Sequence, residues 1–457
     1  MLTPSSAFFR FYRSLMAMTL TMNSPLNMRR QLATLSFALA SIWGPAHVAA
    51  QTGTAAAAAT PSASATAPMS FEEALRIAVT THPTVNSRRN DMQAANARLD
   101  AAMRQRYPGF QAQTGKDAGG GDTTTMRLEK TLWNGGRTAA DIEGAEAGIR
   151  SSSVSVILAQ QEIMARVITA FTDLGRVRTR QLVAQSNVQE HERLAALIGR
   201  RVESQISPMS DGTMANARLA QARAELNQLS ALAERAQSSL TQALGKSVTD
   251  IQTPSFPSLS GTNDFLIRQK ALDYAPALRR LNAEEAVLKA DIESRKSALW
   301  PQIKLRAEKN SGGMVNKSQV YVTMDYQTGA GFVAQAQIKE GFAKLDSLRS
   351  SREAAERDAL EAVNADLADL KSQQMQLKDL RDQVAATTEV FDSSIRQYSV
   401  GRKTWVDVLN AQREVSQSRY AQADAEWGYL RSAMRVNLAT GDLIPESMDS
   451  ESVTAQQ

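Results

Sequence analysis

Four short stretches of the chain alternate apolar and polar residues, which is the pattern of β-strands with two different faces. The first pair lies within 110–132 and the second within 303–326. Charged side chains at alternate positions over about ten residues are typical of transmembrane β-barrel strands, although a half-buried surface hairpin has the same period. In the last strand Tyr321 and Thr323 are expected to face the lumen. The apolar residues of the predicted membrane strands are Phe110, Ala112, Met126, Leu128, Ile303, Leu305, Val320, Val322 and Met324.

Two much longer stretches carry the pattern of α-helices. No proline interrupts residues 136–207 or residues 331–401, and about 70 residues at 1.5 Å each would form a helix of about 105 Å. In the second stretch apolar side chains recur at heptad spacing, as in a coiled coil: Val363, Leu370, Leu377, Val384, Phe391 and Tyr398. Because no compact domain buries so long a helix, each is predicted to lie beside other long helices.

Shorter helices are predicted on both sides of these elements. Before the first strand, two amphipathic helices are expected to break at His82-Pro83, because proline disfavours the helical conformation in the residue before it. Ser207 followed by Pro208 predicts an N-cap and the first position of another helix. Residues 400–404 occupy the corresponding place later in the chain.

The order of these elements occurs twice along the chain. Pro83 and Pro276 each follow an alanine-rich stretch, and Pro108 and Pro301 each open an alternating segment, in both cases 193 residues apart. An offset of this length indicates two pseudo-symmetric halves of one object and not a solenoid. The predicted organisation is a leader at 1–50, a flexible linker at 51–68, a first helix-strand-strand-helix repeat at 69–245, a linker at 246–262, a second repeat at 263–441 and a disordered tail at 442–457.

The leader has the features of a secretory signal peptide in residues 28–50. Two arginines, an apolar run too short to span a bilayer comfortably and a small-residue cleavage site follow one another there; the alternative is a membrane anchor. The mature chain is expected to begin near Gln51, where no cysteine is available for a lipid anchor. Residues 1–50 contain four arginines and no acid, so the formal charge of +5 falls to +1 for the rest of the chain. This near-neutral balance gives no reason to expect nucleic-acid binding.

Side chains suited to catalysis or metal binding are sparse. The chain has no cysteine, and its three histidines lie at spacings that metal sites do not use. Gly245-Lys246-Ser247 resembles the end of a phosphate-binding loop, but Leu240 stands where that loop requires glycine. No nucleophile–base pair or acid dyad is found. The chain is therefore predicted not to be an enzyme and to need no cofactor.

The segment from Gln397 to Ala411 closely resembles the lower-helix signature of the TolC outer-membrane factors. The opening at 71–75, the turn at 132–137 and the duplication are also similar to that family, so the resemblance covers about residues 69–441. It implies a mainly α-helical fold with β-structure: a long α-helical coiled-coil barrel plus a transmembrane β-barrel shared by a homotrimer, with four strands per protomer and two internal repeats. Three copies would close a sheet whose free edges cannot cross a membrane alone.

The same resemblance implies a constriction at the periplasmic tip, where polar links and a ring of acids hold the tunnel shut. The corresponding residues are Tyr398, Lys403, Asp407, Asn410, Asp211 and Thr213. Tyr398 and Lys403 fall on link positions, with Thr213, or Asp211 in its place, as the partner in the first repeat. Asp407 falls on the first acid of the ring, although it could also be a simple exposed charge, and Asn410 replaces the second acid. Lysine lacks the planar fork of the family's usual arginine, and one carboxylate per protomer focuses cations less than two.

Three functions fit these observations. The first is an outer-membrane exit duct for type I protein secretion, working with a periplasmic adaptor and an inner-membrane ABC transporter. The segment 325–331 looks more like the adhesin-export branch of the family, and the missing lipid-anchor cysteine agrees with that branch. The second is the outer-membrane component of a drug or metal efflux pump. The third is a periplasmic coiled-coil adaptor or structural rod.

The first two functions share one location and differ only in the inner-membrane partner. The chain is expected in the outer membrane of a Gram-negative bacterium, with most of its mass in the periplasm. Its partners would be copies of itself, outer-membrane lipid, a periplasmic adaptor, and either an ABC transporter or an efflux pump.

Overall fold

The computed structural model describes residues 68–116, 120–254, 263–312, 316–326 and 333–443. The predicted leader, almost all of the first predicted linker and nearly all of the predicted tail lie outside the described residues. The same holds for most of the segment 325–331, on which the comparison with the adhesin-export branch was based.

Each half of the chain begins with two helices that meet at a proline. These are α3 (Phe71–Thr81) and α4 (Pro83–Arg104) in the first half, and α7 (Asp264–Tyr274) and α8 (Pro276–Lys296) in the second, where a short 3-10 turn, η1 (Ser297–Leu299), follows. The predicted break at His82-Pro83 is confirmed. His82 ends α3, and its Nδ1 atom accepts a hydrogen bond of 3.2 Å from the amide of Thr84, so the same residue caps α4.

Two pairs of long helices follow the strands. They are α5 (Arg137–Glu203) with α6 (Met209–Leu244), and α9 (Val333–Ser399) with α10 (Trp405–Thr440). The first helices of both pairs have 67 residues and the second helices both have 36, so the duplication seen in the sequence is reproduced in the element lengths. Gly245 and Gly441 end α6 and α10 at φ +68° and +84°, a left-handed conformation that glycine adopts without strain.

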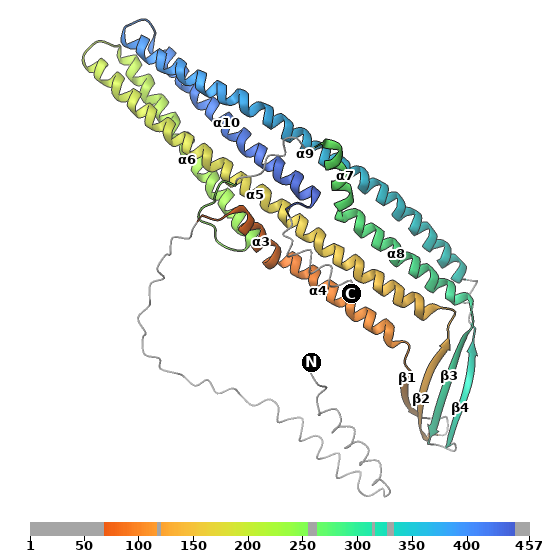
Figure 1. Ribbon diagram of the computed structural model, residues 1–457. Helices are drawn as coiled ribbons and strands as arrows, with labels where there is room; N and C mark the ends of the chain where they lie inside the picture. Colours follow the sequence, from red (N-terminus) through yellow and green to blue (C-terminus); the bar gives the residue numbers. More distant parts are fainter. Residues whose placement is uncertain (1–67, 117–119, 255–262, 313–315, 327–332, 444–457) are drawn as a thin grey trace, which may run out of the picture. The chain divides into compact units, whose positions relative to one another are not determined.

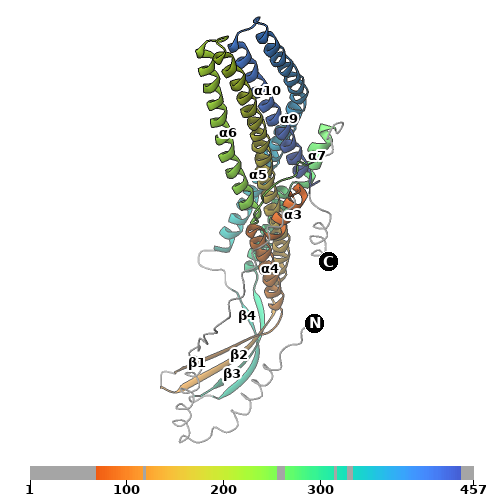
Figure 2. The same cartoon turned by 90° about the vertical axis from the view of Figure 1, so that its left-hand side faces the viewer.

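The helix pairs pack against one another along α5. In Figures 1 and 2 α6 runs back along α5, and α10 runs back along α9. α5 also contacts α3, α4, α8 and α10, so it is the central helix of the described bundle. Its buried apolar face forms the largest core cluster with α3, α6 and α10. Within this cluster Phe71 meets Phe171 edge to face at 5.4 Å between ring centroids.

A four-stranded antiparallel sheet lies at the end of the helices opposite the two interhelical connections (Figure 1). Its strands are β1 (Gly109–Lys116), β2 (Asp122–Trp133), β3 (Gln302–Ser311) and β4 (Lys317–Asp325), in the order β1-β2-β3-β4. The pairing of β2 with β3 joins the two halves of the chain. Between Thr131 and Trp133 the register shifts, which leaves Leu132 as an extra residue of a bulge.

Candidate functional site

One face of the sheet is mainly apolar across all four strands, although the register also places Lys130 and Lys309 on it. Residues paired in register point to the same face, and the register places Phe110 opposite Leu128 and Val322 opposite Leu305. Val320, Val322 and Met324 are 71%, 61% and 69% exposed. The other predicted membrane-strand residues on this face are Ala112, Met126 and Ile303. A row of large exposed apolar side chains of this kind requires a non-aqueous neighbour.

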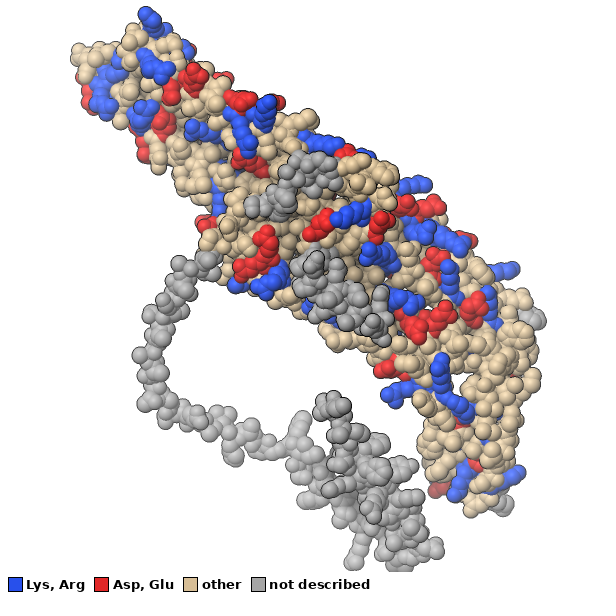
Figure 3. All heavy atoms as spheres, in the orientation of Figure 1, with Lys and Arg blue, Asp and Glu red and all other residues tan. Residues whose placement is uncertain are grey.

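The opposite face of the sheet is charged, and its charges are paired across the strands. Glu129 accepts hydrogen bonds from Arg306 at 2.8 Å and forms an ion pair with Lys304 at 3.1 Å. Glu308 accepts a hydrogen bond of 2.8 Å from the hydroxyl of Tyr321 and pairs with Arg127 at 3.6 Å. The sheet thus separates an apolar surface from a polar surface on which opposite charges are paired. Along the helices charged side chains of both signs are spread over the visible surface, whereas few of them appear over the visible face of the sheet (Figure 3).

Tyr398 lies at the other end of the long helices and joins the two interhelical connections. It is only 8% exposed, and its ring packs against Trp405 at 5.3 Å between centroids. The guanidinium of Arg201 lies 5.0 Å from the ring centroid, within the range of a cation–π contact. The Tyr398 hydroxyl lies 3.2 Å from Oγ of Ser207. These contacts fasten the end of α9 to the α5–α6 connection.

The predicted helix-capping role of Ser207 is wrong. α6 begins one residue later than expected, with Pro208 in extended conformation at the N-cap and no side-chain capping bond. The Ser207 hydroxyl instead contacts Tyr398 and receives a hydrogen bond of 3.3 Å from Nε of Arg201. Neither Ser207 nor Arg201 was predicted as a tip residue from the sequence. Their contact with Tyr398 spans about 190 residues, and no local pattern records it.

Lys403 and Asp407 both make contacts within their own half of the chain. Nζ of Lys403 donates a hydrogen bond of 3.0 Å to Oγ of Ser394. Asp407 accepts hydrogen bonds from the backbone amide of Thr404 at 2.9 Å and from its hydroxyl at 2.7 Å, while Thr404 Oγ1 accepts from the Asp407 amide. This is a reciprocal capping box at the start of α10. The hydroxyl and amide of Thr404, together with the charge of Lys403, hold the pKa of the Asp407 carboxyl below its usual value.

The remaining predicted tip residues lie near this cluster. Asp211 is half-buried in the first turn of α6, and Oγ1 of Thr213 donates to the carbonyl of Met209 at 3.3 Å. Asn410 is exposed one turn after Asp407. Among the described residues, no hydrogen bond joins Tyr398 or Lys403 to Asp211 or Thr213. Within one chain the polar link of Tyr398 therefore runs to Ser207.

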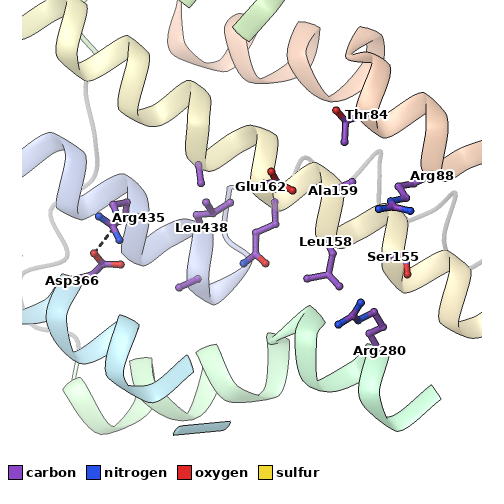
Figure 4. Close-up of a pocket in the computed structure, with 13 residues that line it drawn as sticks. Thr84, Arg88, Ser155, Leu158, Ala159, Glu162, Arg280, Asp366, Arg435 and Leu438 are labelled. Carbon is purple, nitrogen blue, oxygen red and sulfur yellow. Dashed lines mark ion pairs between the residues drawn. The ribbon is translucent and has the colours of Figure 1, made fainter. Parts of the chain in front are cut away.

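A charged pocket lies between the helix pairs, where α4, α5, α8, α9 and α10 meet (Figure 4). Asp366 from α9 is buried and pairs with Nε of Arg435 from α10 at 3.0 Å. Burial raises the pKa of the Asp366 carboxyl, and the adjacent Arg435 guanidinium opposes that rise. Arg88 and Arg280 line the same pocket from α4 and α8. This ion pair ties α9 to α10 far from the tip.

Comparisons with known proteins agree with this geometry. The family described as "Outer membrane efflux protein" matches residues 267–442. The outer membrane efflux protein BepC of Brucella suis biovar 1 (strain 1330) is 22% identical over 340 residues, covering 71% of this chain and 73% of that protein. The cobalt-zinc-cadmium resistance protein CzcC of Cupriavidus metallidurans is 24% identical, covering 65% and 72%. The crystal structure of the outer membrane protein VceC from Vibrio cholerae superposes with a TM-score of 0.71 at 13% identity, covering 81% of this chain and 96% of that one.

Proposed function

The chain matches the outer membrane efflux protein family over residues 267–442, and from this premise we propose that three copies of it form the exit duct of a type I protein secretion machine. The family places the chain in the outer membrane of a Gram-negative bacterium as a transport channel and not an enzyme. The hypothesis of a periplasmic rod that never enters a membrane is therefore wrong. In the proposed machine an inner-membrane ABC transporter and a periplasmic adaptor deliver the cargo.

The main support for a trimeric duct is the sheet, which has two different faces and two free edges. β1 and β4 each pair on one side only, and unpaired strand edges are not tolerated in lipid. The free edge of β4 in one copy can pair with β1 in the next, and closure removes every edge. The apolar face would then contact lipid and the paired charges would line the lumen, as in barrels that conduct water.

The nature of the cargo separates two candidate functions. Protein secretion is supported by the resemblance of the segment 325–331 to the adhesin-export branch and by the absence of cysteine in the whole chain. Efflux of small molecules or metals is supported by the similarity to the efflux protein BepC and to the cobalt-zinc-cadmium resistance protein CzcC.

Deletion of the gene in its own host, followed by complementation, tests the cargo. For protein secretion we expect one large exported protein to disappear from the cell surface or the medium, while inhibitory concentrations of drugs and of cobalt, zinc and cadmium stay unchanged. Increased sensitivity to those compounds with an intact set of exported proteins would assign the chain to efflux instead.

The links at the tip are expected to keep the tunnel narrow. Tyr398→Phe removes the contact with Ser207, and Lys403→Ala removes the bond to Ser394. Each bond is worth about 0.5–1.5 kcal/mol, so the double variant should show a higher single-channel conductance in planar bilayers. Ser207→Ala is the matched control, because it breaks the Tyr398 link from the other side and should act like Tyr398→Phe. Unchanged conductance in all of these variants would contradict a holding role.

Asp407 is proposed to set the ion preference of the constriction. Its carboxyl is exposed and its pKa is held low by Thr404 and Lys403, so it stays charged at neutral pH. Three such charges around one pore attract cations and repel anions, so Asp407→Asn should lower cation selectivity in planar bilayers. Asparagine keeps a side-chain oxygen that can accept the bonds from Thr404 at this N3 position, so the trimer yield is a fair control, and Asp407→Glu should retain selectivity. An intact Asp407→Asn trimer with native selectivity would place the constriction at other residues.

A further inference from the structure

A second polar cavity, separate from both the tip links and the sheet, lies between α5, α6 and α10. It has a volume of about 470 Å³, within the usual range of small-molecule sites. The side chains that matter for its chemistry are Asn187, His191, Arg218, Glu225, Arg413 and Tyr420. They come from all three helices, so the cavity is built by the packing of one chain and does not rest on a single loop or helix end.

Two buried polar side chains of this cavity each present an atom that makes no hydrogen bond within the described part of the chain. These atoms are Nδ1 of His191 and the hydroxyl of Tyr420, and the carboxyl of Glu225 lies close to that hydroxyl. His191 is 7% exposed and Tyr420 is 8% exposed. Unsatisfied buried polar atoms are rare in folded proteins and cost about 1–3 kcal/mol each. A ligand or ordered water in the cavity is therefore expected to meet these two atoms.

Another buried polar side chain of the cavity, Asn187, has its acceptor oxygen already in use. Its Oδ1 atom accepts hydrogen bonds from Nε2 of Gln412 at 3.1 Å and from Oγ of Ser416 at 2.8 Å. These two bonds fix the amide orientation and leave the Asn187 NH₂ group as a donor beside the cavity. The buried wall of the cavity thus offers donors in excess of acceptors.

The charges around the cavity have the same bias. Among the described residues, neither Arg218 nor Arg413 forms an ion pair, and the only acid that lines the cavity is Glu225. Burial and then the charge of Arg218 lower the pKa of His191, against a smaller opposing effect of Glu190. Burial and the nearby Glu225 raise the pKa of Tyr420, so its hydroxyl remains a donor, while Arg180 packs on its ring at 5.0 Å.

We propose that this cavity binds a small oxyanion, a carboxylate or a phosphate, held by the guanidinium groups of Arg218 and Arg413 and by the buried side chains of Asn187, His191 and Tyr420. Charge-assisted bonds from arginine to oxyanions are the strongest hydrogen bonds available to such a site. An anion also offsets the repulsion between Arg218 and a protonated His191. Binding should therefore raise the pKa of His191. Because the cavity lies where α10 packs on the α5–α6 pair, an occupied site would fasten the two helix pairs together.

The experiment uses the full mature trimer in detergent, with ¹³C-labelled histidine. Residues 51–457 contain two histidines, His82 and His191, so each resonance can be assigned with one variant, His82→Asn. Acetate, succinate and phosphate are titrated separately against chloride at constant ionic strength. We expect a saturable shift of the His191 resonance, an upward shift of its titration midpoint, and no response of His82. The separate titrations show whether the cavity prefers a carboxylate or a phosphate as its ligand.

Two arginine variants make the test specific. Arg413→Gln should weaken oxyanion binding about tenfold or more, as expected for loss of one charge-assisted hydrogen bond. Arg419→Gln removes the same charge from α10 at a residue that does not line the cavity, and it should bind like the native chain. The proposal fails if none of the oxyanions shifts the His191 resonance, in which case the cavity holds water only. It also fails if chloride acts equally, or if both arginine variants bind alike.

Discussion

Replacement of Val322 by arginine is expected to abolish assembly of the trimer in the outer membrane. Val322 lies in the middle of β4, pairs with Leu305 and is 61% exposed on the apolar face of the sheet. A lipid-facing arginine near the bilayer midplane costs about 2–4 kcal/mol, and a trimer carries the substitution three times. The yield of heat-modifiable trimer in the outer-membrane fraction measures the effect.

Thr323→Arg is the matched control for this prediction. Thr323 is the next residue of the same strand, pairs with Lys304 and lies on the charged face. An arginine there enters a hydrated surface that already holds Arg306 and Glu129, so the trimer yield should fall far less. Equal losses for the two variants would mean that this sheet does not separate lipid from lumen.

Much of the fold could be predicted from the sequence because local signals set it. The absence of proline predicted helices over 136–207 and 331–401, and the structure has them at Arg137–Glu203 and Val333–Ser399. The alternation of apolar and polar residues located all four strands, because successive side chains of a pleated strand point to opposite faces of the sheet. The bulge at Leu132 could not be predicted, since one extra residue leaves composition and local propensity unchanged.

The tip was harder to predict because its contacts join residues far apart in the sequence. The resemblance located Tyr398, and the structure adds that Ser207 and Arg201 hold it. Serine before proline normally predicts a helix cap, yet here a tertiary contact uses the hydroxyl. For Asp407 the sequence suggested a pore-facing charge, and the structure adds a capping role that is compatible with it. A carboxylate that is already fixed by Thr404 has less freedom to move when the tip opens.

The contact between α5 and α10 depends on a glycine that the sequence does not distinguish from others. Gly175 is buried in the middle of α5, directly under the indole of Trp427 from α10. A methyl group added to Gly175 would lie 2.1 Å from Cη2 of Trp427, well inside van der Waals contact. The indole is also held by the next turn of α5, because its Nε1 donates a hydrogen bond of 2.8 Å to Oγ1 of Thr179. The ring therefore cannot move without losing that bond.

Gly175→Ala is expected to destabilise the chain by about 1–3 kcal/mol, the usual effect of overpacking. The loss of the Trp427 bond adds about 1 kcal/mol, which roughly cancels the gain of about 1 kcal/mol from replacing glycine by alanine within a helix. Gly148→Ala in the same helix should only gain stability from helix propensity, because no other described side chain or neighbouring helix lies within 4 Å of the added carbon. Denaturant unfolding followed by circular dichroism should therefore show opposite signs for the two variants. The double variant Gly175→Ala, Trp427→Phe should recover part of the loss, since the smaller ring leaves room for the methyl group. If Gly175→Ala stabilised the chain as Gly148→Ala does, α5 and α10 would not pack as closely as the contact at Trp427 requires.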